Sequence, residues 1–267
     1  QPQSPLADEA KLRQAMAQVE LRQFPPAIQT LTPLANHATL ADRALLWLAR
    51  AHLQGADPAQ PQPFAQALNT AIGQLAQAAE RAQQRVAQEP EAKARRGEVL
   101  LELGDCQQLA KQYPQAAGTY ETGFKENLSQ QRNEEFLQRR ATALHLAGQF
   151  DPSDQVCAQF QQTFPKSTLL PAVLFRSAEN AYLRAAAIDP AQVPAKNPEL
   201  AKWLTEAANR YKTLLEKYPE FPYASVARYR WALTYYRQDD FVQALKLLAA
   251  IPSADYYRLV STFTTAI

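Results

Sequence analysis

The sequence predicts an all-α protein, a solenoid of about six stacked helical hairpins, and three observations support this prediction. A small residue recurs along the chain in steps of 51, 38, 37, 54 and 37 residues, a spacing typical of repeated helical hairpins. Apolar residues stand around each small residue at gaps of three and four, which places them on one stripe of a helix. Glycine is scarce, at 7 in 267 residues, whereas mixed α/β enzymes need it for tight turns and phosphate loops. The recurring small residues are Ala27, Ala78, Ala116, Ser153, Ala207 and Ala244.

The repeated pattern has a physical reason at each position. The small residue marks the closest approach of a neighbouring helix backbone, and the larger residues around it fill the grooves between side-chain ridges. The proline that follows ends the second helix, because its ring clashes inside a helix and biases the preceding residue towards extended backbone. The clearest copy reads Leu204, Ala207, Tyr211, Leu214 and Pro219. A degraded copy reads Leu75, Ala78, Ala82 and Pro90.

Each repeat is therefore predicted as a first helix, a turn, a second helix and a stop. The repeats are expected at 6–39, 40–90, 92–128, 133–165, 170–219 and 223–252. In the second repeat, a long helix rich in Ala and Gln is expected from Phe64 to about Gln88. The fifth repeat contains an insertion at 188–198 with three prolines; loops of such length often carry function, and the alternative, which we favour, is a surface insertion that the fold merely tolerates. Residues 255–267 begin a further helix, and we expect one domain over 1–267.

These repeats resemble the tetratricopeptide repeat family, which has a small residue in each helix and an aromatic residue four positions after the second one. The third repeat matches this pattern with Leu103, Gly104, Tyr113, Ala116 and Tyr120. The last repeat matches it with Trp231, Tyr235, Phe241 and Ala244. The Phe-Pro and Tyr-Pro exits at 164–165 and 218–219 make the chain look like bacterial envelope members of the family. The resemblance implies a right-handed superhelix whose first helices line a concave groove for extended peptides or helices.

The groove-facing positions of the family, carried over to this chain, give candidate partner-binding residues. Tyrosine and arginine are enriched at protein interfaces because each offers a large contact area with a polar tip. For Tyr229 and Tyr236, the alternative is that they fill the seam between repeats. The candidates are Glu135, Gln138, Thr142, His145, Arg176, Asn180, Arg184, Tyr229, Tyr236 and Arg237.

No catalytic or metal-binding motif is recognisable. The three histidines stand far apart, and neither a His-Glu-x-x-His nor a Cys-x-x-Cys motif is present. Glu98, Glu102 and Asp105 have helical spacing, for which we expect a solvated helix face. Cys106 and Cys157 are expected to be packed free thiols. The chain is predicted not to be an enzyme and to need neither cofactor nor metal; a helical-toroid glycosidase is the catalytic alternative.

Charge and hydropathy limit the class of partner. The net charge is +2, from 28 basic and 26 acidic residues with the signs interspersed, whereas nucleic-acid binding relies on a dominant basic patch. No apolar run approaches the ~20 residues that span a bilayer. We expect a protein or peptide partner, no binding of nucleic acid and no membrane insertion. We also expect possible self-association through the open C-terminal face of the solenoid. An RNA-reading helical repeat is the alternative, and it predicts salt-dependent RNA binding.

The equivalents of the asparagine in a chaperone-type carboxylate clamp are Met16, Asp105, Thr142 and Leu233. This departure from the clamp pattern argues against binding of an acidic chaperone tail.

The leading functional hypothesis is a non-catalytic scaffold that binds a peptide or protein segment in the concave groove, as part of a larger exported bacterial protein or complex. The alternative is a regulatory or substrate-recruiting arm of an enzyme whose catalytic part lies outside this chain. The polar, proline-bearing segment 1–8 fits the remainder of a cleaved secretory signal, which predicts a periplasmic or exported location. A cytoplasmic location is the alternative.

Overall fold

The computed structural model describes residues 5–128, 130–188, 197–253 and 255, which form helices joined by turns, with no strand among them. The chain divides into two compact units, 1–143 and 144–267, with the boundary inside helix α7. Each unit is described by itself, and the single solenoid over 1–267 stays a prediction. No helix in the described part of the chain is both long and apolar enough to span a membrane.

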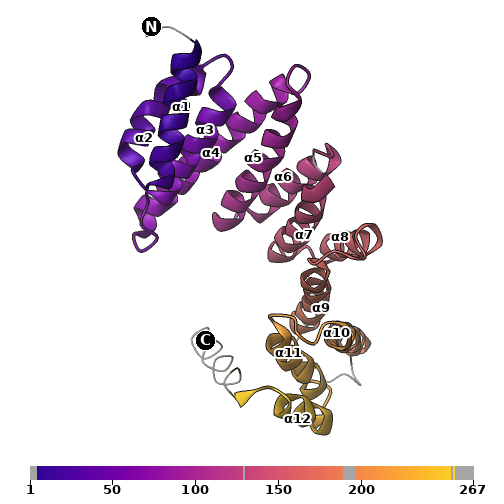
Figure 1. Cartoon of the computed structure of the whole chain (residues 1–267). Coiled ribbons are helices and arrows are strands. Elements are labelled where there is room, and N and C mark those ends of the chain that lie inside the picture. The colour runs from indigo at the N-terminus through magenta and orange to yellow at the C-terminus, as the bar shows by residue number, and fades with distance from the viewer. Residues whose placement is uncertain (1–4, 129, 189–196, 254, 256–267) are drawn as a thin grey trace. The chain divides into compact units, whose positions relative to one another are not determined.

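Unit 1, residues 1–143, is a series of hairpins in which consecutive helices pack on one another (Figure 1). Its helices are α1 (Pro5–Glu20), α2 (Phe24–Leu31), the 3-10 helix η1 (Thr32–Asn36), α3 (Ala41–Gln54), α4 (Pro61–Arg85), α5 (Pro90–Leu109), α6 (Tyr113–Lys125) and α7 (Gln130–Leu146), the last of which continues into unit 2. The contacts α1 with α2, α3 with α4, and α5 with α6 form the hairpins, and α4 also packs on α5.

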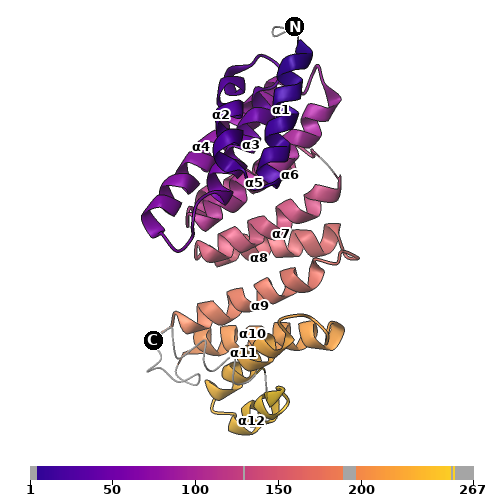
Figure 2. The same ribbon diagram turned by 60° about the vertical axis from the view of Figure 1, so that its left-hand side comes forward.

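Unit 2, residues 144–267, is also built of helical hairpins, in which α9 packs on α10 and α11 on α12 (Figure 2). Its helices are α8 (Phe150–Thr163), α9 (Leu170–Ala186), α10 (Pro198–Lys217), α11 (Ala224–Tyr236) and α12 (Phe241–Ala249). We call the first helix of each hairpin an A helix (α1, α3, α5, α7, α9 and α11) and the second a B helix (α2, α4, α6, α8, α10 and α12). The predicted all-α fold of stacked helical hairpins is confirmed.

The observed helix ends differ from the predicted ones by a few residues. Helix α4 ends at Arg85 instead of about Gln88, and Pro90 begins α5 instead of serving only as a stop. Proline fits the first turn of a helix because its missing N–H would have no partner there. Residues 189–196 of the predicted insertion, and residues 256–267 of the predicted further helix, lie outside the described residues.

The recurring small residues lie in the interior. Ala27, Ala78, Ala116, Ser153 and Ala207 are 0% exposed. The small residue within an A helix has the same role in the third repeat, where a Cβ added to Gly104 would overlap the ring of Tyr120 on the B helix. Ridge-into-groove packing at such close approach explains why the sequence pattern alternates small and aromatic residues.

Four hairpins turn in the same way. The residue two before each of these B helices has a left-handed backbone, with φ of 57° at Arg22, 59° at Lys111, 72° at Gly148 and 60° at Asp239. The next residue donates its backbone N–H to the carbonyl five positions earlier, as in Gln112 to Gln107 at 2.8 Å. This hydrogen bond satisfies a carbonyl that helix termination would leave without a partner.

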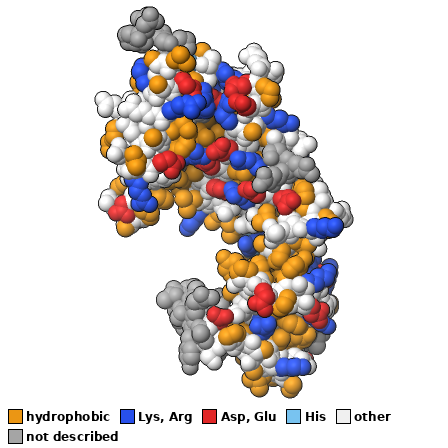
Figure 3. All heavy atoms as spheres, viewed as in Figure 1, with side chains coloured by type: hydrophobic (Ala, Val, Ile, Leu, Met, Phe, Trp, Pro, Cys, Tyr) orange, Lys and Arg blue, Asp and Glu red, His pale blue; other side chains and the backbone are white. Residues whose placement is uncertain are grey.

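Ion pairs join successive A helices within each unit. Arginine on one A helix meets a carboxylate on the next or previous one; the pairs are Glu9–Arg43, Asp42–Arg95, Arg50–Glu98, Arg50–Glu102, Asp105–Arg139 and Glu179–Arg230. The expected solvated face of Glu98, Glu102 and Asp105 is therefore an ion-paired one, because guanidinium groups from neighbouring A helices neutralise it. On the face shown in Figure 3, acidic and basic side chains are interspersed over unit 1.

Candidate partner-binding surface

Three of the predicted residues lie on the part of α7 that belongs to unit 1. Glu135 forms an ion pair with Arg139 at 3.2 Å, and the hydroxyl of Thr142 donates to the carbonyl of Gln138 at 3.1 Å. All three predicted side chains are half-buried. They remain a candidate surface of unit 1, separate from the predicted residues of unit 2.

His145 and Asn180 are buried, at 7% and 0% exposure, and they bind each other. The amide nitrogen of Asn180 donates to Ser153 at 2.9 Å and to Asp154 at 2.8 Å, so its oxygen accepts from Nδ1–H of His145 at 2.7 Å. Burial, followed by the charge of Arg176, lowers the pKa of His145 to about 4. These two predicted contact residues thus have an internal role, since their side chains do not reach the surface.

Arg184 also faces the neighbouring helices. Its guanidinium lies 2.5 Å from the carboxylate of Asp151 and 4.3 Å from the ring centre of Trp203. The reason is geometric: positions four apart on a helix are rotated by only about 40°, so Arg176, Asn180 and Arg184 form one row that faces α8. All three side chains share one face of α9, as predicted, and this face lies against α8.

Arg176 differs from its two predicted companions. Its side chain is partly buried, and its Nε has no hydrogen-bond partner among the described residues. Burial lowers the pKa of Arg176, and the nearby charge of Glu179 offsets part of this effect. Nε of Arg43 and Nε of Arg140 share this condition, so Arg176 is not exceptional among the described arginines.

Sequence reasoning missed a carboxylate centre beside Arg176. Glu179 is 8% exposed; it accepts a hydrogen bond from the hydroxyl of Tyr211, and one of its oxygens lies 3.7 Å from Nε of Arg230. Arg230 in turn lies over the ring of Tyr182 at 4.8 Å. The sequence signal that could have predicted this contact is an acidic residue in one A helix and a basic residue in the next, each among apolar residues.

The predicted residues of α11 lie on its outer side. Tyr236 is 59% exposed, and its ring meets that of Phe241 edge to face at 5.4 Å, so it combines a seam contact with an open surface. Tyr229 and Arg237 are partly exposed. Arg237 is the C-cap residue of α11, two turns beyond Arg230 along the chain.

We name the α9–α11 surface by the residues that define it. The Glu179–Arg230 contact joins the two helices, and the other members lie within two turns of one of these residues. The α9–α11 surface consists of Glu179, Tyr229, Arg230 and Arg237.

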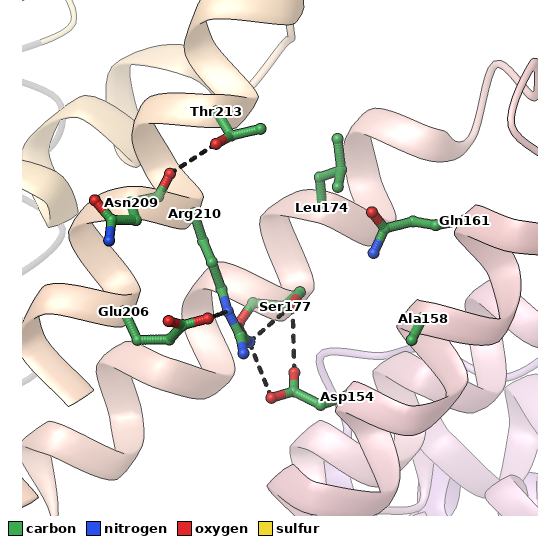
Figure 4. Close-up of a pocket in the computed structure, with 9 residues that line it drawn as sticks. All are labelled: Asp154, Ala158, Gln161, Leu174, Ser177, Glu206, Asn209, Arg210 and Thr213. Carbon is green, nitrogen blue, oxygen red and sulfur yellow. Dashed lines mark hydrogen bonds and ion pairs between the residues drawn. The ribbon is translucent and has the colours of Figure 1, made fainter. Parts of the chain in front are cut away.

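A polar pocket of about 400 Å³ lies between α8, α9 and α10 of unit 2 (Figure 4). Arg210 points to its centre and donates to Asp154 at 2.9 Å, to Glu206 at 2.7 Å and to the hydroxyl of Ser177 at 2.8 Å. The charged groups of this pocket therefore bind one another, and we assign them a role in holding α8, α9 and α10 together.

An apolar pocket of about 580 Å³ lies where the α8–α9 and α10–α11 loops are adjacent. Its aromatic wall includes Phe221 and Tyr223, and Tyr223 stacks on Phe175 with ring centres 6.1 Å apart. The proline-rich exit of the fifth repeat supplies this wall, and its sequence pattern did not predict a pocket.

The two cysteines are buried. Burial, followed by the charge of a nearby carboxylate, raises the pKa of Cys106 to about 11 and that of Cys157 to about 12. Both are packed thiols that stay protonated at neutral pH. Within the described ranges no cluster of His, Cys, Asp and Glu has the geometry to hold a metal ion.

No family model matches the sequence, and no curated protein matches it. Among solved structures, the chain is similar to BtubC (BKLC) from P. vanneervenii, at 16% identity and a TM-score of 0.52, over 97% of this chain and 92% of that one. It is also similar to a STAND-type signal transduction ATPase with a tetratricopeptide repeat sensor from Pyrococcus horikoshii, at 13% identity and a TM-score of 0.49, over 97% of this chain and 43% of that one. A thermophilic tetratricopeptide repeat protein of Thermus thermophilus is similar at 18% identity and a TM-score of 0.35, over 86% of this chain and all of that one. The likeness to BtubC concerns the fold alone, and it supports the stacked helical hairpins.

Proposed function

We propose that this chain is a non-catalytic scaffold that binds a segment of another protein on the α9–α11 surface. The observation that carries the proposal is the presence on this surface of partly exposed tyrosine and arginine side chains, Tyr229 and Arg237, beside the ion pair that joins α9 to α11. Interface hot spots are enriched in these residue types, because they join a broad contact area to directed polar groups. The ion pairing of the carboxylates and the protonated state of both thiols favour a binding role over a catalytic one.

Selection of a random 12-residue peptide library on the full chain would test this proposal. We expect enriched peptides whose affinity falls about tenfold in Tyr229→Ala and Arg237→Ala, the loss typical of interface anchors. Lys212→Ala, an exposed residue of α10, is the matched control and should leave the affinity within about twofold. Absence of enriched peptides, or peptides that bind both surface variants as tightly as the wild type, would contradict the proposal.

The exported bacterial context and the periplasmic location stay predictions of the sequence. Fractionation of a bacterium that expresses the natural gene would test them, with the protein expected among soluble periplasmic proteins. Recovery with cytoplasmic markers would favour the alternative location.

A further inference from the structure

Helix α12 carries a stripe of exposed apolar side chains. Of the nine large apolar side chains that are exposed in the described residues, three lie on this nine-residue helix: Phe241, Val242 and Leu245. Positions three and four apart share one side of a helix, so the three are continuous. Tyr236 of α11 extends them, because its exposed ring meets that of Phe241 at 5.4 Å. We call Tyr236, Phe241, Val242 and Leu245 the α12 stripe.

The central residue of the stripe, Leu245, differs from its counterparts in other hairpins. In three other B helices the equivalent position, directly after the recurring small residue, is an alanine that is 5% exposed: Ala79, Ala117 and Ala208. Leu245 is 68% exposed. The distance between packed helices depends on the side chains at the contact, so a leucine here suits a neighbour that packs further away than the neighbours of these alanines.

The charges at the two ends of α12 are opposite in sign. Asp239 and Asp240 are exposed at its N-terminal end, and Arg228 of α11 reaches its C-terminal end, where it donates to the carbonyl of Ala250 at 3.4 Å. None of these three charged groups forms an ion pair within the described part of the chain. Two antiparallel α12 helices would bring each Arg228 towards the aspartates of the other copy, whereas parallel helices would bring aspartate to aspartate.

We propose that two copies of this chain associate through their α12 stripes, antiparallel and related by a two-fold axis at Leu245. A two-fold interface uses the same patch on both copies, and Leu245 is the middle residue of Phe241–Ala249, so it meets its own counterpart while the ends exchange charges. Four side chains cover less than the about 800 Å² per partner of a standard interface, so we expect a reversible dimer with a dissociation constant above about 1 μM. This association does not depend on the proposed function.

Sedimentation velocity of the full chain, at concentrations from about 1 μM to about 500 μM, would measure the association. We expect the fraction of dimer to rise with concentration. Leu245→Glu should weaken the dimer at least about tenfold, because it would bury a carboxylate without a partner at the axis. Leu109→Glu makes the same change at a leucine of α5 that is 55% exposed; this matched control should change the affinity less than about twofold.

Charge reversal tests the antiparallel direction. Arg228→Glu should weaken the dimer about fivefold, because it places a carboxylate opposite the aspartates of the other copy. Combining it with Asp239→Lys should strengthen the dimer about threefold relative to Arg228→Glu alone. Lysine fits the left-handed backbone at 239, since Lys111 has the same conformation in another hairpin turn. A double variant without this recovery would contradict the antiparallel direction.

Cross-linking tests the position of the axis. Both cysteines of the sequence, Cys106 and Cys157, are buried, so the wild-type chain is expected not to cross-link. Leu245→Cys places a thiol at the axis, and mild oxidation should then link two chains, because a disulfide forms where two Cα atoms lie within about 7 Å. Leu109→Cys is the matched control, and we expect at most about a tenth as much linked dimer from it.

Three results would overturn the inference: a monomer at all concentrations, an affinity that Leu245→Glu leaves unchanged, and equal cross-linking of Leu245→Cys and Leu109→Cys. Dimers that dissociate in Leu245→Glu without cross-linking in Leu245→Cys would place the stripe against a different part of the other copy, and they would overturn the two-fold arrangement. If library peptides bind the α9–α11 surface while the chain stays monomeric, the proposed function stands and only this inference fails.

Discussion

The hydroxyl of Tyr211 donates a hydrogen bond to the carboxylate of Glu179, joining a B helix to the A helix of its own hairpin. Tyr120 occupies the same repeat position two hairpins earlier and donates in the same way to Asp105, at 2.7 Å. Glu179 is almost fully buried, whereas the side chain of Asp105 is 49% exposed. One repeated contact thus occurs in two very different solvent environments.

This difference predicts unequal losses of stability. Tyr211→Phe removes a donor from a buried carboxylate, and we expect the free energy of unfolding to fall by about 2 kcal/mol. Tyr120→Phe should lower it by about 1 kcal/mol or less, because water can replace the hydroxyl at Asp105. Urea unfolding of both variants, followed by circular dichroism, would measure the two values, and equal losses would contradict the role of burial.

The glycines of the third repeat predict opposite effects of the same substitution. Gly104→Ala would push a methyl group into the ring of Tyr120, and we expect a loss of about 1–3 kcal/mol from overpacking. Gly118→Ala, on the neighbouring helix α6, meets no atom within 4 Å and should stabilise the protein by up to about 1 kcal/mol. Thermal unfolding of the pair is the measurement. A Gly104→Ala variant as stable as Gly118→Ala would show that the seam is loosely packed.

The hairpin turns allow a matched exchange at one backbone position. Lys111 and Gly148 have the same left-handed conformation, which a side chain disfavours by about 1 kcal/mol. Lys111→Gly should therefore raise the free energy of unfolding by several tenths of a kcal/mol, and Gly148→Ala should lower it by about 1 kcal/mol. If both variants raised, or both lowered, the free energy of unfolding, the left-handed backbone conformation would not be the cause of the change.

The helical hairpins were predictable from the sequence, but the conformation of the turns within them was not. The spacing of the small residues along the sequence indicates which residues meet between the helices. Ala116 and Ala207 are fully buried there, and a larger side chain at either position would not fit. The left-handed turns at Arg22, Lys111 and Asp239 carry no glycine, so the residue type gave no signal for them. For the candidate surface, four-residue spacing correctly grouped Arg176, Asn180 and Arg184 on one face of α9. It could not tell that this face packs against α8, because spacing along a helix says nothing about the helix's rotation relative to its neighbours.

His145 predicts a pH dependence of stability. Its pKa is about 4 in the folded protein, against 6.5 for a histidine side chain in water. As the pH falls from about 6.5 to about 4, the unfolded chain binds a proton that the folded protein excludes, so the free energy of unfolding decreases across this window, by about 3 kcal/mol in total. Above pH 6.5 this contribution is constant and fully present.

Comparison with His145→Gln isolates this effect from the carboxylates that titrate nearby. Glutamine retains a donor for Asn180 but cannot be protonated, so the difference in unfolding free energy between the two proteins should change between about pH 6.5 and 4. Urea unfolding at half-unit steps of pH would measure it. A difference that stays constant over this window would refute the assigned role of His145.

The order of acid and arginine in the ion pairs between neighbouring A helices differs from pair to pair. The acid belongs to the earlier helix in Glu9–Arg43 and Asp105–Arg139, and the order is reversed where Arg50 meets Glu98. The seams between hairpins are lined by alanine, so shape alone would allow hairpins to pack in the wrong order. In a wrong order, charges of the same sign on adjacent A helices would face each other and repel. The hairpins of this chain are therefore not interchangeable building blocks: their electrostatic edges encode which one follows which, and shuffled assemblies made from them should associate less firmly than the natural succession.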